Sequence, residues 1–313
     1  MIYLEIAGRL GNQMFRYAFT RKLQKELKEK DLVINFNRVD REEGQGWEDS
    51  LKLFKTKYIA DHETKSVLKQ NKMSLKQKAI YIFYKTTCFI IRKIKKDDRQ
   101  FQLKCQKLLS KNGLYWLELG YYPYSYNKNK NSFYYVYGCF ECAKYFDDIR
   151  TDLLEEFTPK KPEEEKNKQL YEKIRCTESV CISIRRGDFV SNPEFSKKYQ
   201  VCTPKYYYEA VEKIKERLPN LNLFVFSDEV EWAKENLDFG DIPVFYEDGT
   251  DSVDEKLRLM YNCKHFILSN STFSWWAQYL SKNKEKIVIS PSRWYADGKD
   301  SDLIEESWIK IQV

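Results

Sequence analysis

Histidine is nearly absent from this sequence, whose two histidines, His62 and His265, lie far apart along the chain. The CxxC pair Cys139 and Cys142 has no second CxxC to complete a zinc site, which needs four ligands. Most of the eight cysteines lie in apolar or mixed stretches, where a thiol behaves as a small hydrophobic group. The sequence therefore predicts neither a metal centre nor a disulfide framework.

Long hydrophobic runs are also missing. The mostly apolar residues 79–91 are interrupted by Lys85, whereas a membrane-spanning helix needs about 20 apolar residues. This stretch lies within residues 65–111, which are rich in lysine and arginine. Two interpretations stay open: a helix packed on the first domain, which we favour, or an interfacial helix whose basic flanks touch anionic lipid. The opening residues lack a basic leader, an apolar run and a cleavage site, so we expect a cytoplasmic protein.

The charge balance does not single out a nucleic-acid binder. The chain has 54 lysines and arginines against 47 aspartates and glutamates, well mixed, with a net charge of +7. RNP, KH and zinc signatures are missing, so we expect no nucleic-acid partner. With 313 residues, 42% of them hydrophobic and 16% aromatic, the chain is long enough for two globular domains.

Strand and helix patterns alternate at both ends of the chain. Residues 2–36 read as strand, turn, helix and strand, and residues 180–290 alternate continuous apolar strands with helices. Residues 154–169 combine prolines with mixed charge and no apolar period, which is typical of a linker. Apolar strands alternating with helices predict an α/β fold with parallel sheets. We expect the strands of the second half at 180–184, 221–227, 242–246, 265–269 and 286–290.

Polar motifs follow several of these strands. Arg185 and Arg186 begin RRGD after one strand, Asp228 and Glu229 follow the next, and SNSTFSWW opens a helix at residues 269–276. Ligands of open α/β sheets bind at the carboxyl ends of the strands, and arginine and a helix N-terminus both favour phosphate. The turn GRLGNQ at residues 8–13 lets the backbone approach a ligand closely, although it matches neither GxGxxG nor a Walker loop.

Each of these motifs also has a purely structural interpretation. The arginines can pair with Asp188 at the surface. The residues SNST can act as the N-cap of the helix that follows them, and the glycine turn can be only a tight connection. Asp228 and Glu229 can be a solvated helix start. Trp275 and Trp276 fit core positions better than stacking platforms.

Three motifs in order resemble the bacterial α-1,2-fucosyltransferases of glycosyltransferase family 11: GRLGNQMFRYAF, SIRRGDF, and LMYNCKHFILSNSTFSWWAQYL with KIVISPSRWY. The resemblance covers nearly the whole chain and is weakest at about residues 40–110. It implies a GT-B architecture, with two Rossmann-like domains whose parallel sheets face each other across a cleft. The acceptor-side domain would span residues 1–157, with a basic helical insertion at about 61–111. The GDP-sugar domain would span 158–313, and its last segment would pack back on the first domain.

The resemblance also implies roles for particular residues. Arg185 would contact the donor phosphate, supported by Arg186 and Asp188. Guanine would be read by an acidic side chain near Asp254 and Glu255, with an ambiguity of a residue or two. The remaining donor contacts would come from Gly11, Asn12, Ser183, Asp228, Ser271, Thr272 and Phe273.

One position departs from the family pattern. Related enzymes usually begin the second motif with histidine, whereas this chain has Ser183, which leaves guanine recognition less secure than phosphate recognition. The general base is open between Glu194 and Asp188, and a plain surface glutamate remains an alternative for Glu194.

The implied reaction moves L-fucose from GDP-L-fucose to the 2-hydroxyl of a terminal β-galactoside, with inversion and without a metal or other cofactor. Its product would belong to a bacterial surface polysaccharide or a glycan mimic. The alternatives are transfer of another nucleotide sugar and a non-catalytic glycan- or nucleotide-binding protein. The basic middle segment adds the hypothesis of a lipid-linked acceptor and peripheral contact with the inner face of the cytoplasmic membrane.

Overall fold

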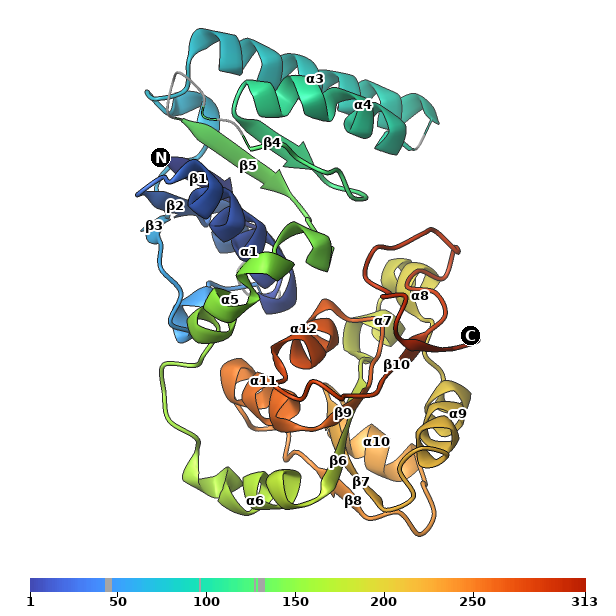
Figure 1. The fold of residues 1–313 in the computed structure, drawn as a ribbon. Helices are drawn as coiled ribbons and strands as arrows, with labels where there is room; N and C mark the ends of the chain where they lie inside the picture. The colour runs from blue at the N-terminus through green and yellow to red at the C-terminus, as the bar shows by residue number, and fades with distance from the viewer. Residues whose placement is uncertain (43–46, 96, 127, 129–132) are drawn as a thin grey trace. The chain divides into compact units, whose positions relative to one another are not determined.

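The computed structural model describes residues 1–42, 47–95, 97–126, 128 and 133–313. The chain divides into two compact units, Met1–Thr158 and Pro159–Val313, and this division falls inside the 154–169 segment. In Figure 1 the first unit runs from blue to green and the second from yellow-green to red.

The first unit is built on a five-stranded sheet in the order β3-β2-β1-β5-β4, in which every pair is parallel. Its strands are β1 (Ile2–Glu5), β2 (Leu32–Asn35), β3 (Ile59–Asp61), β4 (Leu114–Leu117) and β5 (Tyr134–Gly138). Its helices are α1 (Leu10–Leu27), α2 (Asn37–Arg41), α3 (Leu75–Lys95), α4 (Arg99–Lys111) and α5 (Arg150–Glu156). Short 3-10 turns lie at Leu51–Leu53, Val67–Lys69, Ala143–Tyr145 and Asp147–Ile149.

Local sequence explains the first β/α connection. Gly8 has φ +81°, a left-handed conformation that residues with a Cβ rarely adopt, and it turns the chain from β1 into α1. The helix ends where Lys28 is left-handed and its N–H bonds to the carbonyls of Gln24 and Lys25. Strands β4 and β5 were not predicted from the sequence, although LYWL in β4 and YYVY in β5 are continuous runs of apolar and aromatic residues.

Aromatic side chains dominate one core of this unit. Tyr81 and Tyr84 of α3 pack against Trp116 of β4, with ring centroids 5.1 and 5.2 Å from the Trp116 ring. The Tyr84 hydroxyl also donates to the Trp116 carbonyl at 3.0 Å. The helix expected within residues 65–111 is therefore present as α3, and it packs on the first unit by its Tyr81 and Tyr84 face, as we favoured.

The second unit has a six-stranded sheet in the order β11-β10-β9-β6-β7-β8, again with every pair parallel. The strands are β6 (Glu178–Ile184), β7 (Leu221–Ser227), β8 (Val244–Tyr246), β9 (His265–Ile267), β10 (Val288–Pro291) and β11 (Ile309–Ile311). The helices are α6 (Lys168–Cys176), α7 (Gly187–Ser191), α8 (Pro193–Tyr199), α9 (Pro204–Lys215), α10 (Val230–Asn236), α11 (Val253–Asn262) and α12 (Thr272–Leu280), with a 3-10 turn at Glu165–Asn167.

The sequence patterns of the second half correspond closely to these elements. The strand expected at 221–227 is β7 residue for residue, because its continuous apolar run is buried on both faces. Trp275 and Trp276 are fully buried, which confirms their core positions. Ile309–Ile311, in the last segment that we expected to pack back on the first domain, pair with β10 at the edge of this second sheet. The two parallel sheets and their helices confirm the expected α/β class.

Candidate functional site

The strand order of the second unit marks one place where a ligand can bind. β6 pairs with β7 on one side and with β9 on the other, and the chain builds outward from β6 first toward β8 and then toward β11. The loops after β6 and β9 therefore leave the sheet in opposite directions. Open α/β sheets bind ligands outside the carboxyl ends of the strands at such a switch point. Arg185 follows β6, and Ser271 follows β9.

Two carboxylates orient Arg185. Its Nη1 lies 2.7 Å from Oδ2 of Asp228, and its Nη2 donates to Asp188. The guanidinium carbon lies 5.5 Å from the centroid of the Phe189 ring, and 23% of the side chain is exposed. An arginine carries five N–H donors, so these two contacts leave others for phosphate oxygens. Asp228 and Asp188 thus hold the guanidinium in place at the end of β6 without using all its donors.

Arg186 is held by the two acidic residues that follow β7. Its backbone N–H donates to Oδ1 of Asp228 at 2.9 Å, and its Nε lies 2.9 Å from Oε2 of Glu229. Its guanidinium carbon stacks 3.4 Å from the centroid of the Trp232 ring. Trp232, in α10, was not expected from the sequence, where only its place one turn after Asp228 and Glu229 could have suggested it. Arg186 therefore anchors the loop to α10, and Asp228 bridges both arginines.

Three serine hydroxyls join the ends of β6 and β9 to α12. Oγ of Ser183 lies 2.5 Å from Oγ of Ser274 and 3.4 Å from Oγ of Ser269, and the last two lie 2.9 Å apart. All three residues are buried. Ser183, where related enzymes usually have histidine, thus uses its hydroxyl inside the protein.

The first turn of α12 is capped as the sequence suggested. The Ser271 hydroxyl accepts a hydrogen bond from the Phe273 N–H at 3.3 Å. Ser271, Thr272 and Phe273 are half-buried, so this turn remains accessible. Asn270, which the sequence did not single out, donates to the carbonyls of Tyr199 and Trp294 at 2.8 and 2.9 Å and so holds the loop after β9.

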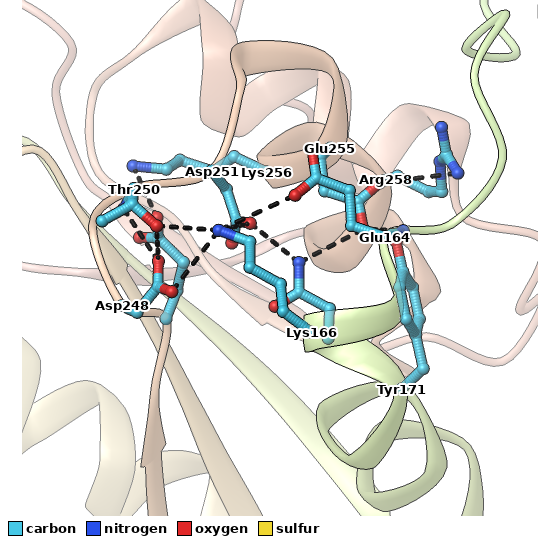
Figure 2. A network of polar contacts seen from close by, with 11 residues as sticks. Glu164, Lys166, Tyr171, Asp248, Thr250, Asp251, Glu255, Lys256 and Arg258 are labelled. Atoms are coloured by element: carbon cyan, nitrogen blue, oxygen red, sulfur yellow. Dashed lines mark hydrogen bonds and ion pairs between the residues drawn. The ribbon is translucent and has the colours of Figure 1, made fainter.

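The two acidic residues at the start of α11, Asp254 and Glu255, lie in different environments. Figure 2 shows Glu255 inside a polar network at the entry to the second unit. Its Oε1 accepts from the Glu164 N–H at 3.1 Å, from Asn167 Nδ2 at 3.2 Å and from the Tyr171 hydroxyl at 3.0 Å, while Oε2 lies 3.4 Å from Arg258. Glu255 therefore holds the linker and α6 on α11.

Asp254 is also buried, but within the described part of the chain its carboxylate makes no hydrogen bond or ion pair. The first turn of α11 lies at the same edge of the sheet as Arg185, because Nζ of the neighbouring Lys256 lies 3.4 Å from the carbonyl of Ser227, the last residue of β7. Of the two acidic residues, Asp254 is the one whose carboxylate makes no polar contact within the described residues.

Three further carboxylates lie close enough together to share a cation: Glu247, Asp248 and Asp251. Two lysines already pair with them, and Figure 2 shows Lys166 beside Asp248 and Asp251. Nζ of Lys166 lies 2.8 Å from Asp251 and 3.4 Å from Asp248, and Nζ of Lys256 lies 3.1 Å from Glu247. Burial raises the pKa of Glu247, against the opposing effect of Lys256. We interpret the group as an ion-pair network that supports α11.

Glu194, the first candidate for a general base, lies at the start of α8. Its backbone N–H donates to Oδ1 of Asn192 at 3.0 Å, in a capping interaction, and its side chain is exposed. The other candidate, Asp188, is paired with Arg185.

The glycine turn of the first unit lies at the switch point of its own sheet, since β1 pairs with both β2 and β5. Arg16 connects the loops after β1 and β5: Nε donates to the Gly138 carbonyl at 2.6 Å, and Nη1 donates to the Ala7 carbonyl. Gln13 donates to the Gly8 carbonyl at 2.8 Å. Neither Arg16 nor Gln13 was singled out from the sequence. Helical periodicity does not show that a polar side chain of the helix is buried and bonded to a neighbouring loop.

Gly11 and Asn12 lie in the first turn of α1, which this scaffold holds. A Cβ on Gly8 would come within 2.7 Å of Nδ2 of Asn12, so the glycine is needed for the Asn12 side chain to occupy its position. The GRLGNQ turn is therefore held in place by contacts within the first unit.

Two curated relatives from Escherichia coli are similar to this chain. Alpha-1,2-colitosyltransferase is 39% identical over 181 residues, which cover 56% of this chain and 61% of the relative. The O-antigen biosynthesis glycosyltransferase WbnK is 29% identical over 320 residues, which cover 99% of this chain and all of the relative. The chain thus spans about three fifths of the length of the first relative and the full length of the second.

A solved structure shares the fold. The NodZ α-1,6-fucosyltransferase soaked with GDP-fucose superposes with a TM-score of 0.50 at 11% identity, over 93% of this chain and 94% of that one. The similarity confirms the expected GT-B class. The family model described as glycosyl transferase family 11 matches residues 1–312, and the chain therefore belongs to this family of glycosyltransferases.

Proposed function

We propose that the protein transfers L-fucose from GDP-L-fucose to the 2-hydroxyl of a terminal β-galactoside. The observation that carries the proposal is the position of Arg185 and the Ser271–Phe273 turn on the two sides of the β6/β9 switch point. The names of relatives in the same family, among them a galactoside alpha-(1,2)-fucosyltransferase of Leontopithecus chrysomelas, support the reaction class.

The chemical task is to break a sugar–phosphate bond while negative charge gathers on departing GDP. Arg185 donates charge-assisted hydrogen bonds to the phosphates, and the free N–H groups at the start of α12 add the positive end of the helix dipole. Arg186 and Asp228 keep the Arg185 loop in position. Donors oriented before the reaction stabilise the transition state more than the ground state, because the charge develops only as the bond breaks.

Attack by the acceptor hydroxyl in a single displacement inverts the anomeric centre, so β-linked fucose becomes α-linked. Glu194 is our first candidate for the base that takes the hydroxyl proton, because it is exposed and not engaged with Arg185. Asp188 is the alternative. No step needs a metal ion, so EDTA should leave activity intact, and a strict requirement for manganese would contradict this mechanism.

We assign guanine recognition to Asp254. A carboxylate can accept both the N1–H and the 2-amino hydrogens of guanine, which no other common nucleobase presents together. The burial of Asp254 and the absence of a partner for its carboxylate within the described residues support this role. Glu255 is excluded from it by its contacts to Tyr171 and Asn167.

The first unit takes the acceptor in this proposal, and Gly11 and Asn12 approach the donor from that unit. The product would be a fucosylated surface polysaccharide or glycan mimic made in the cytoplasm. The name of the WbnK relative, an O-antigen biosynthesis glycosyltransferase, supports this setting.

A second donor deserves a direct test, because the 39% identical relative is named a colitosyltransferase. Colitose is fucose without its 3-hydroxyl. A pocket that hydrogen-bonds this hydroxyl rejects the deoxy sugar strongly, whereas an apolar pocket discriminates far less. The donor preference therefore reports the polarity of the pocket around the sugar.

The experiment is to incubate the protein with GDP-fucose or GDP-colitose and a panel of β-galactosides, and to analyse the products by mass spectrometry. We expect a product with the mass of a fucosylated galactoside. An α-1,2-fucosidase should remove the fucose from this product. If only a colitosylated product forms, the donor is GDP-colitose and the assignment of GDP-fucose is wrong. Binding of GDP without transfer or donor hydrolysis would favour a non-catalytic binding protein.

A further inference from the structure

Helix α3 uses one face to pack on the first unit. Tyr81, Tyr84 and Cys88 are buried in the core beneath it. At its start, Gln77 donates to the carbonyls of Asn112 and Phe133 at 2.8 and 3.0 Å. Figure 1 shows α3 and α4 side by side at the β4 edge of the sheet. The inward face of α3 is therefore occupied by contacts within the first unit.

The opposite face of α3 is apolar as well, and it is exposed. Ile82 and Phe89 lie two turns apart, as do Phe83 and Ile90, so all four project from one side of the helix. Phe83 and Phe89 are 60% and 62% exposed. Ile94 extends this outward apolar face toward the helix end. Monomeric soluble proteins rarely expose a contiguous apolar surface of this kind unless something covers it.

The charges carried by α3 and α4 all have one sign. α3 carries six lysines and arginines and α4 carries four, and neither helix contains an aspartate or glutamate. Lys93 lies directly beside the apolar face, with its Nζ 5.6 Å from the centroid of the Phe89 ring. Among the residues that the structure describes, Arg92 is the one of these cations that pairs with acids, at Asp98 and Glu118. The outward apolar face is thus bordered by cations.

We propose that α3 is a docking surface for an anionic lipid bilayer and lies flat in the headgroup region. Its 21 residues give a helix about 31 Å long, and the Phe83 and Phe89 side chains would enter the boundary between headgroups and acyl chains. Lysines at its border would pair with anionic headgroups. Within the described residues no helix is both long and apolar enough to cross a membrane, so this contact is peripheral.

The charges favour a bilayer over the other occupants of an apolar helix face. A second copy of the chain would bring the same ten-cation surface against itself, which like charges oppose. A nucleic acid would pair with the cations but would leave the phenylalanines and isoleucines in water. An anionic lipid surface matches both the apolar face and the cations of α3.

The test is co-sedimentation of the full chain with vesicles. We expect binding to vesicles of phosphatidylcholine and phosphatidylglycerol in equal amounts, loss of binding in high salt, and no binding to pure phosphatidylcholine. The double variant Phe83→Ser/Phe89→Ser should weaken partitioning at least about tenfold, because it removes the inserted side chains. Lys78→Gln/Lys93→Gln should weaken it about tenfold or more, since each cation near an anionic surface contributes.

Ile59→Ser is the matched control, because Ile59 is an exposed apolar residue of the same unit outside α3. It should bind vesicles as the parent does. Far-UV circular dichroism and thermal unfolding should show that all variants are folded. Equal binding by the Phe83→Ser/Phe89→Ser variant and the parent, or equal binding of the parent to neutral and anionic vesicles, would overturn the proposal.

A concentration-dependent dimer in light scattering that the Phe83→Ser/Phe89→Ser variant abolishes, with no vesicle binding by the parent, would also overturn it in favour of a second copy. The inference does not depend on the proposed reaction. Vesicle binding can be measured without donor or acceptor, so its failure and a failure of transfer are separate results.

Discussion

Nη1 of Arg185 lies 2.7 Å from Oδ2 of Asp228, a contact that joins the loop after β6 to the loop after β7. The other carboxylate oxygen of Asp228 accepts the Arg186 N–H at 2.9 Å. One aspartate thus sets the path of the RRGD backbone and the direction of the Arg185 side chain. If Arg185 stabilises departing GDP, the rate of transfer should depend on this contact as well as on the arginine itself.

Arg185→Ala should lower the rate of transfer by about 10²-fold or more, because it removes charge-assisted donors that act on the transition state. Arg185→Lys should recover only part of the rate, since lysine keeps the charge but lacks the planar fork. Release of GDP in the presence of acceptor measures both. Arg217→Ala is the matched control, because Arg217 is exposed and lies before the start of β7, at the opposite edge of the sheet. A rate for Arg185→Ala within about threefold of the parent would contradict the role.

Gly187→Ala should lower the rate about tenfold or more with little loss of stability. A Cβ at this position would meet Oδ2 of Asp228 at 2.5 Å, so the carboxylate must move away from Arg185. Small displacements of a positioning group cost rate more than they cost folding. Ser191→Ala, at the end of the same helix α7, should behave as the parent enzyme. Parallel measurements of turnover and thermal unfolding decide the matter, and an unchanged rate would mean that Asp228 does not position Arg185.

Asp254→Asn should weaken GDP binding about 10- to 100-fold, because the amide loses the charge that accepts hydrogen bonds from guanine. Binding of UDP, which has no guanine, should change little. Isothermal titration with both nucleotides separates the two effects. Equal losses for GDP and UDP would indicate a general disturbance of the site and would remove the assignment to Asp254.

Glu255→Gln should have the complementary phenotype and lower the free energy of unfolding by about 2 kcal/mol. Its Oε1 accepts three hydrogen bonds, and an amide in its place would leave buried donors such as the Tyr171 hydroxyl without a charged acceptor. GDP affinity of the folded variant should stay near that of the parent. Urea unfolding measures the first quantity, and a variant with normal stability but weak GDP binding would exchange the roles of Asp254 and Glu255.

The stability of the second unit should fall as the pH drops below about 6.5 because of His265. Its Nδ1 accepts the Ile287 N–H at 3.0 Å, which places the ring proton on Nε2 facing Glu178. Burial lowers the pKa of His265 from its ordinary 6.5, although Glu178 acts in the opposite direction. The unfolded chain therefore takes up the proton first as the pH falls, so this stabilisation is complete above about 6.5 and is lost progressively below it.

Urea unfolding of the parent and of His265→Gln at about pH 7.5 and about pH 5 tests this sign. The parent should lose more stability between the two conditions than the variant does. Equal losses in both proteins would show that acid sensitivity arises from other groups.

The strand and helix patterns of the second half were predictable because they depend on near neighbours in the chain. β7 contains the continuous apolar run LFVF between Asn222 and Ser227, and its bounds matched. β4 and β5 were not predictable in the same way, because Tyr115, Tyr134 and Tyr135 are buried despite their hydroxyls. Their burial depends on side chains from helices distant in sequence: Tyr135 packs on Tyr81 of α3, and Tyr115 packs on Phe19 of α1.

The candidate site, too, was predictable from the sequence only in part. Arg185, Ser271 and Asp228 could be named from the sequence because each follows an apolar strand, and parallel strands place their carboxyl ends at one edge. Their partners could not be named. The Asp228 contact to both arginines, the enclosed hydroxyl of Ser183 and the different environments of Asp254 and Glu255 all involve residues from separate elements.

The sequence alone determined the α/β class, the order of the motifs and the family resemblance, because short-range periodicity and local turn chemistry are written in consecutive residues. The tertiary structure decided which carboxylate holds Arg185, which acidic residue of α11 is already engaged, and which side of α3 is left uncovered. These are choices among neighbours brought together by the order of strands in the sheet. A given run of strands and helices is compatible with several such orders, and the packing of side chains selects one.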